Sequence, residues 1–405
     1  MVDAGEKNFG VCELNFDVNR WWSRLVIALV IIRVIMVGLL LGDVPKLDYH
    51  VGWAFYHGGD IYPYFIAAQR ALGGEFTYVP MSGAWVLWLA LAIRLTNANV
   101  YEEALAFLTP FHSFVLGSLS VWVMAQLTWR LTASRWQSLI ATVAWTFSPY
   151  LMWWAFGFFP QAVSLRNVFV SRQFWANGLT DGQAIFFALL GGCLLVCAYP
   201  LTSAQGSRQH LWILAGVSLG LAAAIRIHSL AMIAPMVFAL MLMRQWRAMA
   251  WLALGGVVGF SPQLIYSALF GRVLDIPYIR NWLRPEENGL RFEWNNTPFS
   301  PRFLLENFLT ITRGNWALML IAVLGCAILA YAFWQMWVRR GKVEALTAFV
   351  APAASFGVHV STYLFFDDPI RFTMPALSLG VPALVWTFFQ AGLLFRNFWV
   401  KGSRV

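Results

Sequence analysis

The feature that most limits the fold of this chain is a succession of apolar stretches, each close to the length that crosses a lipid bilayer. The first, LVIALVIIRVIMVGLLL, runs from Leu25 to Leu41 and contains one charge, Arg33. A helix of about 20 apolar residues crosses the roughly 30 Å of hydrocarbon in a membrane. Hydrophobic residues make up 60% of the chain and charged residues 12%, and the mean hydropathy is +0.63. These values exclude a soluble globular protein and predict an all-α polytopic membrane protein.

The apolar pattern predicts a bundle of about ten transmembrane helices in a single domain over residues 1–405. The spans are expected at about 23–41, 108–129, 136–152, 182–199, 211–225, 229–243, 248–269, 314–337, 345–365 and 373–395. The first span reads as a retained anchor, since no cleavable signal peptide is visible. A shorter apolar stretch at 82–95 is expected to lie at the outer face of the membrane, as a juxtamembrane helix. Long outer loops are expected at about 42–107, 153–181 and 270–313.

Charged residues give the expected orientation of the bundle. With both termini in the cytoplasm, the short inner connections are rich in arginine and lysine, and the outer segments hold most of the acids. Counting residues 82–95 as a span would move the basic turn RLTASR at 130–135 to the outside. We therefore expect a multi-pass cell (inner) membrane protein, or an ER membrane protein in a eukaryote. Because only the outer, periplasmic face is elaborated, the active site is expected there.

Two other classes of function are disfavoured by composition. The net charge of +9 comes from scattered residues that form no basic run or nucleic-acid motif, so no nucleic-acid partner is expected. The four cysteines, Cys12, Cys193, Cys197 and Cys326, have no metal-ligand spacing with histidines and imply no disulfide framework. We expect neither a metal site nor a cofactor.

Two acids stand where expected outer segments meet helices. Asp60 opens DIYPYFIAAQRALGG, a helix-like stretch that ends in a glycine pair. Asp181 lies in ANGLTDGQAIFFALLGG, directly before the fourth expected span. Each acid has two interpretations. It caps or complements the start of a helix, or it is a carboxylate held at the outer face for proton transfer.

Basic residues at or within the apolar stretches are the other candidates. Arg226 and His228 interrupt an apolar region, where a charge usually faces a cavity or an anion; the alternative for Arg226 is a tight turn exposed to lipid headgroups. Arg371 follows DDPI at the outer start of the tenth span, where a local ion pair is the alternative role. Arg33 is expected to have a partner inside the bundle and a structural role.

These motifs, taken in order along the chain, resemble the GT-C class of integral-membrane glycosyltransferases. The resemblance is closest to the group containing lipid A aminoarabinose transferase and the protein O-mannosyltransferases. The first outer loop reads GDIYPYFIAAQRALGGEFTYVP, followed by the short apolar helix SGAWVLWLALAIRL. The match continues with a hairpin that has a basic turn, TWRLTASRWQSL. It is completed by three later segments: GLTDGQAIFFALL, GLAAAIRIHSLAMIAP and DDPIRFTMPAL. The paired acid of many members is absent at Asp60, whose neighbour is Ile61, and Asp43 and Asp48 lie closer to the first span.

The resemblance implies a hexosyl- or pentosyltransferase with a polyprenyl-phosphate sugar as donor and a lipid, glycan or protein hydroxyl as acceptor. Asp60 is then the general base, with Asp48 and Asp43 as alternative bases, and Asp181 orients the acceptor or the donor sugar. The donor phosphate is expected to bind Arg226, Arg371 and, more weakly, His228. Substrate contacts are assigned to the tyrosines of the first-loop motif, Tyr62, Tyr64 and Tyr78. The reaction is expected to invert the anomeric centre without a metal ion.

Two functions from other classes remain open. A multi-span transporter or lipid flippase would use the carboxylates and Arg33 as coupling charges at membrane depth. A noncatalytic membrane scaffold would use the outer loops as partner surfaces. Polar groups concentrated outside and short inner loops favour the transferase.

Overall fold

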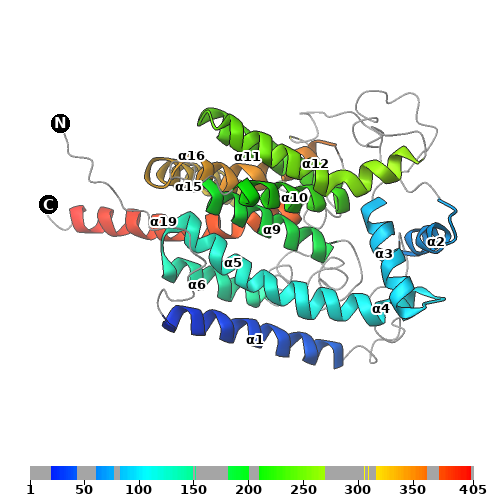
Figure 1. Ribbon diagram of the computed structural model, residues 1–405. Coiled ribbons are helices and arrows are strands. Elements are labelled where there is room, and N and C mark those ends of the chain that lie inside the picture. The colour runs from blue at the N-terminus through cyan, green and yellow to red at the C-terminus, as the bar shows by residue number, and fades with distance from the viewer. Residues whose placement is uncertain are drawn as a thin grey trace.

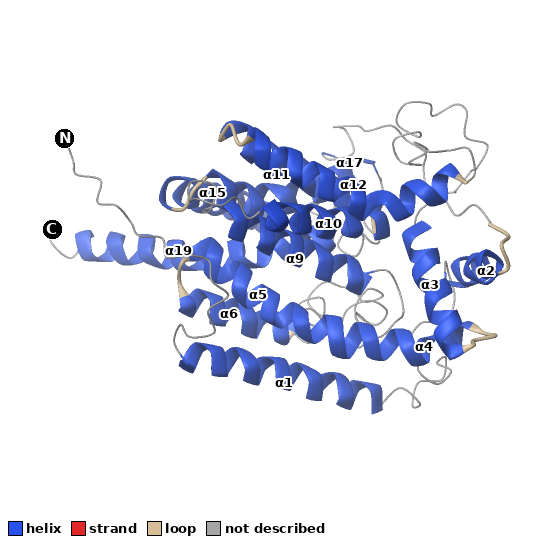
Figure 2. Cartoon of the chain, in the orientation of Figure 1, coloured by secondary structure: helices blue, strands red, loops and turns tan. Residues whose placement is uncertain are grey.

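The computed structural model describes residues 20–42, 61–76, 83–148, 151, 181–199, 209–269, 305, 309, 316–362 and 374–402, and every regular element within these ranges is a helix (Figures 1 and 2). The elements of the first half are α1 (Arg20–Gly42), α2 (Ile61–Leu72), α3 (Gly83–Thr96), α4 (Tyr101–Pro110), the π-helical turn η2 (Phe111–Leu116), α5 (Gly117–Thr132), α6 (Arg135–Thr146) and α9 (Asp181–Ala198). Those of the second half are α10 (Gln209–Ile225), the 3₁₀ turn η6 (Ile227–Ser229), α11 (Leu230–Leu242), α12 (Trp246–Ala268), α15 (Trp316–Arg339), α16 (Lys342–Ala345), the π-helical turn η7 (Leu346–Val350), α17 (Ala351–Thr362), the 3₁₀ turn η8 (Ser378–Gly380) and α19 (Val381–Gly402).

Each apolar stretch predicted to span a membrane coincides with helical structure. In the described part of the chain, four helices are long and apolar enough to cross a bilayer: Arg20–Leu39, Tyr101–Thr132, Trp246–Ala268 and Met374–Arg396. Shorter apolar helices at Gly182–Ala198, Gln209–Ile225, Leu230–Leu242 and Val323–Arg339 fall on four further expected spans. The remaining two expected spans fall on α6 and on α16 to α17. The chain is thus an all-helical membrane protein, while the count of about ten spans stays a prediction.

Large apolar side chains cover the outside of the bundle as well as its interior. Ile35 is 55% exposed, Val257 59%, Val323 56% and Phe388 77%, on α1, α12, α15 and α19 respectively. Continuous apolar surfaces of this kind are unfavourable in water and match the hydrocarbon of a bilayer. The exposed faces therefore agree with the composition in placing these helices in a membrane.

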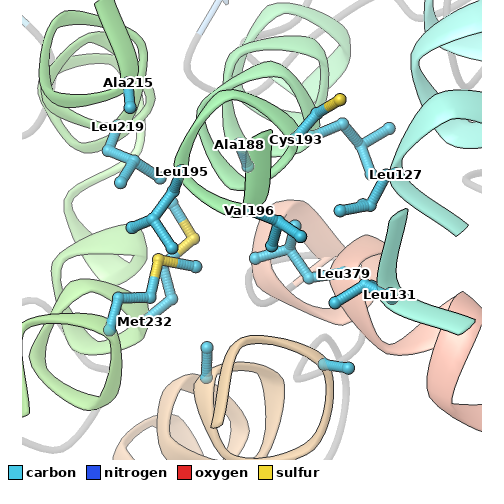
Figure 3. Close-up of a cluster of buried hydrophobic side chains, with 14 of the residues drawn as sticks. Leu127, Leu131, Ala188, Cys193, Leu195, Val196, Ala215, Leu219, Met232 and Leu379 are labelled. Carbon is cyan, nitrogen blue, oxygen red and sulfur yellow. The ribbon is translucent and has the colours of Figure 1, made fainter. Parts of the chain in front are cut away.

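Helix α9 lies at the centre of the largest buried cluster (Figure 3). Its sequence is apolar on all sides, and a helix without a polar face is stable only when neighbours surround it. Figure 3 shows Leu195 and Val196 of α9 between Leu127 of α5 and Met232 of α11, with Leu379 of η8 nearby. The position of α9 fixes that of its first residue, Asp181.

Helices α10 and α12 run parallel and pack through glycines. Each carries two glycines four residues apart on the contact face, Gly216 with Gly220 and Gly255 with Gly259. A methyl group added at Gly216 would overlap the carbonyl oxygen of Leu252, and one added at Gly255 would overlap that of Ile213. Small residues at this spacing let two helix backbones approach closely in a membrane. The pair forms a closely packed wall, and α10 of this wall packs against α9.

The basic ends of several helices gather at one end of the bundle. Trp22, near the start of α1, lies against Trp129 near the end of α5, with ring centroids 5.7 Å apart. Arg340, just after α15, donates hydrogen bonds of 2.9 Å from Nε to the carbonyl oxygen of Leu131 and from Nη2 to that of Arg130. These bonds satisfy carbonyls that have no partner at the end of α5. Three of the segments predicted to be cytoplasmic, at the start of α1, at the end of α5 and directly after α15, therefore lie together.

The opposite end of the bundle carries α2, α3 and α4 (Figure 1). Residues 83–96 form the separate helix α3, which Figure 1 shows running across the ends of the long helices rather than along them. The three short helices share a second buried cluster that includes Phe65, Trp85, Leu89 and Leu105. The span expected at 108–129 belongs to a longer helical segment that begins at Tyr101. In this segment α4, η2 and α5 are continuous. We call this end the α3 end of the bundle.

Candidate functional site

Three alanines and an isoleucine bring three helices together at the α3 end. Ala84 on α3, Ala184 on α9, and Ala224 and Ile225 on α10 form one buried cluster. Ala84 is the second residue of α3, Ala184 lies in the first turn of α9, and Ile225 is the last residue of α10. The start of α3 therefore covers the start of α9 and the end of α10, which come from distant parts of the sequence.

The start of α3 is also held by α12. The backbone N–H of Gly83 donates a 2.6 Å hydrogen bond to Oε1 of Gln263, whose Nε2 donates to Oγ of Ser267 at 3.2 Å. The first N–H groups of a helix have no partner within the helix, so the buried Gln263 satisfies one of them across the interface. A methyl group added at Gly83 would lie 2.5 Å from Cβ of Tyr266. A glycine is required here because the α3 backbone lies directly on a tyrosine of α12.

Two of the sequence-predicted residues flank this junction. Asp181 is the first residue of α9, three residues before Ala184, and Arg226 directly follows Ile225. Arg226 is 7% exposed, so the alternative of a turn exposed to lipid headgroups is wrong. Its backbone N–H donates to the carbonyl oxygen of Ala222 at 2.8 Å, which extends the hydrogen bonding of α10 by one residue. A guanidinium at the C-terminal end of a helix is stabilised by the helix dipole.

The start of α9 is tied to the continuous helix of α4, η2 and α5 by a buried histidine. His112 is 1% exposed and lies on η2, directly after Pro110 and Phe111. The indole N–H of Trp88 donates to its Nε2 at 3.1 Å, and the side-chain amide nitrogen of Gln183 lies 2.5 Å from the same Nε2 and 3.0 Å from Nδ1. Gln183 is two residues after Asp181. One network therefore connects α3, η2 and the first turn of α9.

Helix α2 carries Tyr62 and Tyr64, two of the three tyrosines predicted to contact substrate. The hydroxyl of Tyr62 donates a 3.0 Å hydrogen bond to Oε1 of Glu102 on α4. Burial, the hydrogen bond to Glu102 and the charge of that carboxylate together raise the pKa of Tyr62 above its ordinary value. Tyr64 is half-buried and packs against the α2–α3–α4 cluster. In this structure Tyr62 holds α2 against α4, whatever further contact it makes.

The remaining predicted site residues lie outside the described residues. These are the candidate bases Asp43, Asp48 and Asp60, together with Tyr78 and Arg371. At Asp181 and His228 the structure describes the backbone alone. His228 belongs to the 3₁₀ turn η6 between α10 and α11, two residues after Arg226. The structure thus brings the positions of Asp181, Arg226 and His228 to one end of the bundle, and their roles stay predictions.

Sequence reasoning missed the polar residues that hold the junction. His112, Gln183, Gln263 and Glu102 were not singled out, although the first three lie in apolar stretches. A polar side chain in an apolar stretch is costly unless it is paired, and that cost was the available signal. Within the described ranges, no group of three His, Cys, Asp or Glu side chains gathers closely enough to hold a metal ion. The metal-independent reaction stays a prediction.

Comparison with known proteins gives a fold and no sequence family. No protein-family model matches the chain, and no curated protein matches its sequence. Among solved structures, the apo oligosaccharyltransferase of Archaeoglobus fulgidus superposes with a TM-score of 0.52 at 15% sequence identity, covering 93% of this chain and 52% of that one. The archaeal oligosaccharyltransferase AglB from Archaeoglobus fulgidus, in complex with an inhibitory peptide and a dolichol-phosphate, gives a TM-score of 0.51, also at 15% identity, with coverage of 94% and 51%.

These matches define the architecture of the chain. It shares the fold of an archaeal oligosaccharyltransferase, which is a GT-C glycosyltransferase, and it spans about half the length of that enzyme. At 15% identity the likeness concerns the fold alone. The GT-C-like bundle inferred from the sequence motifs therefore has structural support, whereas the closer resemblance to the aminoarabinose and O-mannosyltransferase group has none of its own.

Proposed function

We propose that this protein transfers a sugar from a polyprenyl-phosphate donor to a hydroxyl group of a lipid, glycan or protein acceptor. The observation that carries the proposal is the junction at the α3 end, where the buried Arg226 directly follows α10 and the backbone position of Asp181 begins α9. Such a transfer requires a cation for the leaving phosphate, for which Arg226 is the candidate at this junction, and a carboxylate that acts as the base. The shared fold with AglB, a structure of which contains a dolichol-phosphate, supports a lipid-phosphate donor.

A carboxylate is needed because an acceptor hydroxyl is a weak nucleophile. As the hydroxyl oxygen attacks the anomeric carbon, its proton moves to a general base, for which we propose Asp60, with Asp48 and Asp43 as alternatives. The bond from the anomeric carbon to the phosphate oxygen breaks in the same step, and the electron pair leaves with the lipid phosphate. A single displacement of this kind inverts the anomeric centre. Asp181 is proposed to orient one of the two substrates.

A buried cation is needed because the leaving phosphate gains charge as the bond breaks. A guanidinium stabilises phosphate oxygens through two parallel hydrogen bonds. Arg226 is the best-supported candidate, because it is buried in protein at the junction and ends a helix of the bundle wall. Arg371 and, more weakly, His228 are proposed to complete the phosphate site. The proposed chemistry uses no metal ion or cofactor.

The α3 end is proposed to face the outside of the cell membrane, or the lumen of the ER in a eukaryote. The basic helix ends gather at the opposite end of the bundle, as the positive-inside rule expects for a cytoplasmic face. A lipid-phosphate donor in the outer leaflet then presents its sugar at the level of α2 and α3. Tyr62, Tyr64 and Tyr78 are proposed to contact it there.

The proposal is tested with purified protein in liposomes that contain a radiolabelled polyprenyl-phosphate sugar and a lipid extract as acceptor. The expected result is a labelled product with the inverted anomeric configuration and release of polyprenyl phosphate in equal amount. The lipid flippase alternative predicts movement of the donor between leaflets with no new product. Movement without product would therefore overturn the transferase and favour the flippase.

A further inference from the structure

We propose that His112 is a positioning residue that fixes the first turn of α9, and with it Asp181, by holding the side chain of Gln183. The inference rests on the proposed function for its catalytic consequence, although the contact itself belongs to the fold. His112 on η2 and Gln183 on α9 are 71 residues apart in the sequence, and both are buried. Gln183 shares the first turn of α9 with Asp181.

The amide nitrogen of Gln183 contacts both ring nitrogens of His112. It lies 2.5 Å from Nε2 and 3.0 Å from Nδ1, and the indole N–H of Trp88 donates to Nε2 at 3.1 Å. The imidazole therefore links the start of α9 to α3 through two separate side chains, Gln183 and Trp88.

The local backbone supplies a reason for the histidine to be at this place. Pro110 has no N–H group to donate within the helix, and the next six residues form the π-helical turn η2. Single π-helical turns inside longer helices shift the direction of the following side chains and are frequent near functional sites. The rings of Trp85 and Trp88 lie 5.9 Å and 6.4 Å from that of His112. The imidazole therefore lies between the tryptophan rings of α3 and the side-chain amide of Gln183 on α9, with which it forms a hydrogen-bond contact.

A change in turnover is expected because group-transfer reactions are sensitive to small displacements of the residues that orient the substrates. A shift of about 1 Å in a positioning group reduces turnover by roughly a hundredfold even where the group makes no contact with substrate. Loss of the bond from His112 to Gln183 frees the first turn of α9, where Asp181 begins the helix. We expect a lower kcat with little change in the KM for the donor, because the phosphate is assigned to Arg226 and not to α9.

Two substitutions separate the link to Gln183 from the link to Trp88. Gln183→Leu removes the amide and leaves the indole N–H of Trp88 on the ring. Trp88→Phe removes the indole N–H and leaves the amide of Gln183 against the ring. We expect Trp88→Phe to retain more than half of the wild-type kcat, and Gln183→Leu to lose about tenfold or more. His112→Leu should resemble Gln183→Leu, and the double variant of these two residues should be no slower than either single one.

The outcome is decided by kcat, KM and hydrogen exchange on the full chain in detergent. Equal kcat for Gln183→Leu and Trp88→Phe, or a loss confined to Trp88→Phe, would overturn the positioning role. If the wild-type protein has no transferase activity, the proposed function fails, yet the link is still tested by exchange. Amides 185–188 of α9, whose helical hydrogen bonds go to the carbonyls of its first turn, should exchange faster in Gln183→Leu than in Trp88→Phe at equal melting temperature. Identical exchange would show that Gln183 does not hold this turn.

Discussion

The guanidinium of Arg33 on α1 donates a 2.9 Å hydrogen bond from Nη1 to the backbone carbonyl oxygen of Thr146, the last residue of α6. Arg33 is 4% exposed, near the middle of a helix long enough to span a membrane. The last carbonyls of a helix have no partner within the helix, so the bond satisfies one of them and joins α1 to α6. The partner expected for Arg33 inside the bundle is confirmed by this contact, and its structural role stays a prediction.

Removal of the Arg33 side chain should destabilise the bundle. In Arg33→Met the Thr146 carbonyl loses its buried donor, which costs about 1–3 kcal/mol. Thermal unfolding in detergent should therefore begin at a lower temperature than for the wild type. The control is Ile32→Met on the same helix, whose side chain is 36% exposed and should melt like the wild type. A melting temperature for Arg33→Met equal to that of the control would show that the bond contributes nothing.

Close packing of α10 and α12 predicts a strong cost for a single methyl group. Gly216→Ala should lower the free energy of unfolding by about 1–3 kcal/mol, because the added carbon overlaps the carbonyl oxygen of Leu252. Gly325→Ala on α15 is the matched control, since nothing lies within 4 Å of its new methyl group. Alanine is the better helix former, so the control should be neutral or slightly stabilised. Similar unfolding curves for the two variants would contradict the parallel glycine contact.

The buried Glu344 at the basic end predicts a pH-dependent stability. Burial raises the pKa of Glu344, while a backbone hydrogen bond and the charge of Arg340 oppose the shift in part; Tyr199 also faces this carboxylate. Below the ordinary pKa of a glutamic acid, the group is protonated both folded and unfolded. Between the ordinary pKa and the raised pKa, the folded chain keeps the proton while the unfolded chain loses it. Stability therefore falls as the pH rises from the ordinary pKa through the raised one.

Glu344→Gln should remove this fall and melt at a higher temperature than the wild type at neutral pH. The measurement is the melting temperature between pH 4 and pH 8, with Glu75→Gln, an exposed carboxylate after α2, as control. The control should keep the wild-type profile. A less stable Glu344→Gln at neutral pH would mean that attraction to Arg340 outweighs the cost of burial.

The contact of Tyr62 with Glu102 predicts that α2 depends on one hydroxyl. Tyr62→Phe should weaken the attachment of α2 to α4 by about 0.5–1.5 kcal/mol, the net worth of a typical hydrogen bond. Hydrogen exchange of the α2 amides should become faster, with little change in the bundle. Ile66→Leu, at an exposed position of α2, should leave exchange unchanged. Unaltered exchange in Tyr62→Phe would leave substrate contact as the role of this tyrosine.

The sequence was sufficient to predict the helices and their basic ends, but it did not predict the contacts between helices that are distant along the chain. Apolar runs have a local signature, and so does the short helix at 82–95, because each depends on consecutive residues. The burial of Arg226 and the pairing of His112 with Gln183 depend on helices that meet only in the folded bundle. Nothing local distinguishes Glu102, the partner of Tyr62, from any acid in a first helical turn. The four-residue spacing of glycines in α10 and in α12 can be read from the sequence, but the packing of these two helices against each other cannot.

The most direct test of the account is the affinity of the purified protein for polyprenyl phosphate, measured with and without the guanidinium of Arg226. A charge-assisted hydrogen bond contributes about 1.5–3 kcal/mol, so Arg226→Gln should weaken binding by roughly 10- to 100-fold. Arg94→Gln, at an exposed position near the end of α3, is the control and should bind like the wild type. The account predicts that loss of affinity is confined to Arg226→Gln. Equal affinity for the two variants, at equal melting temperature, would contradict it.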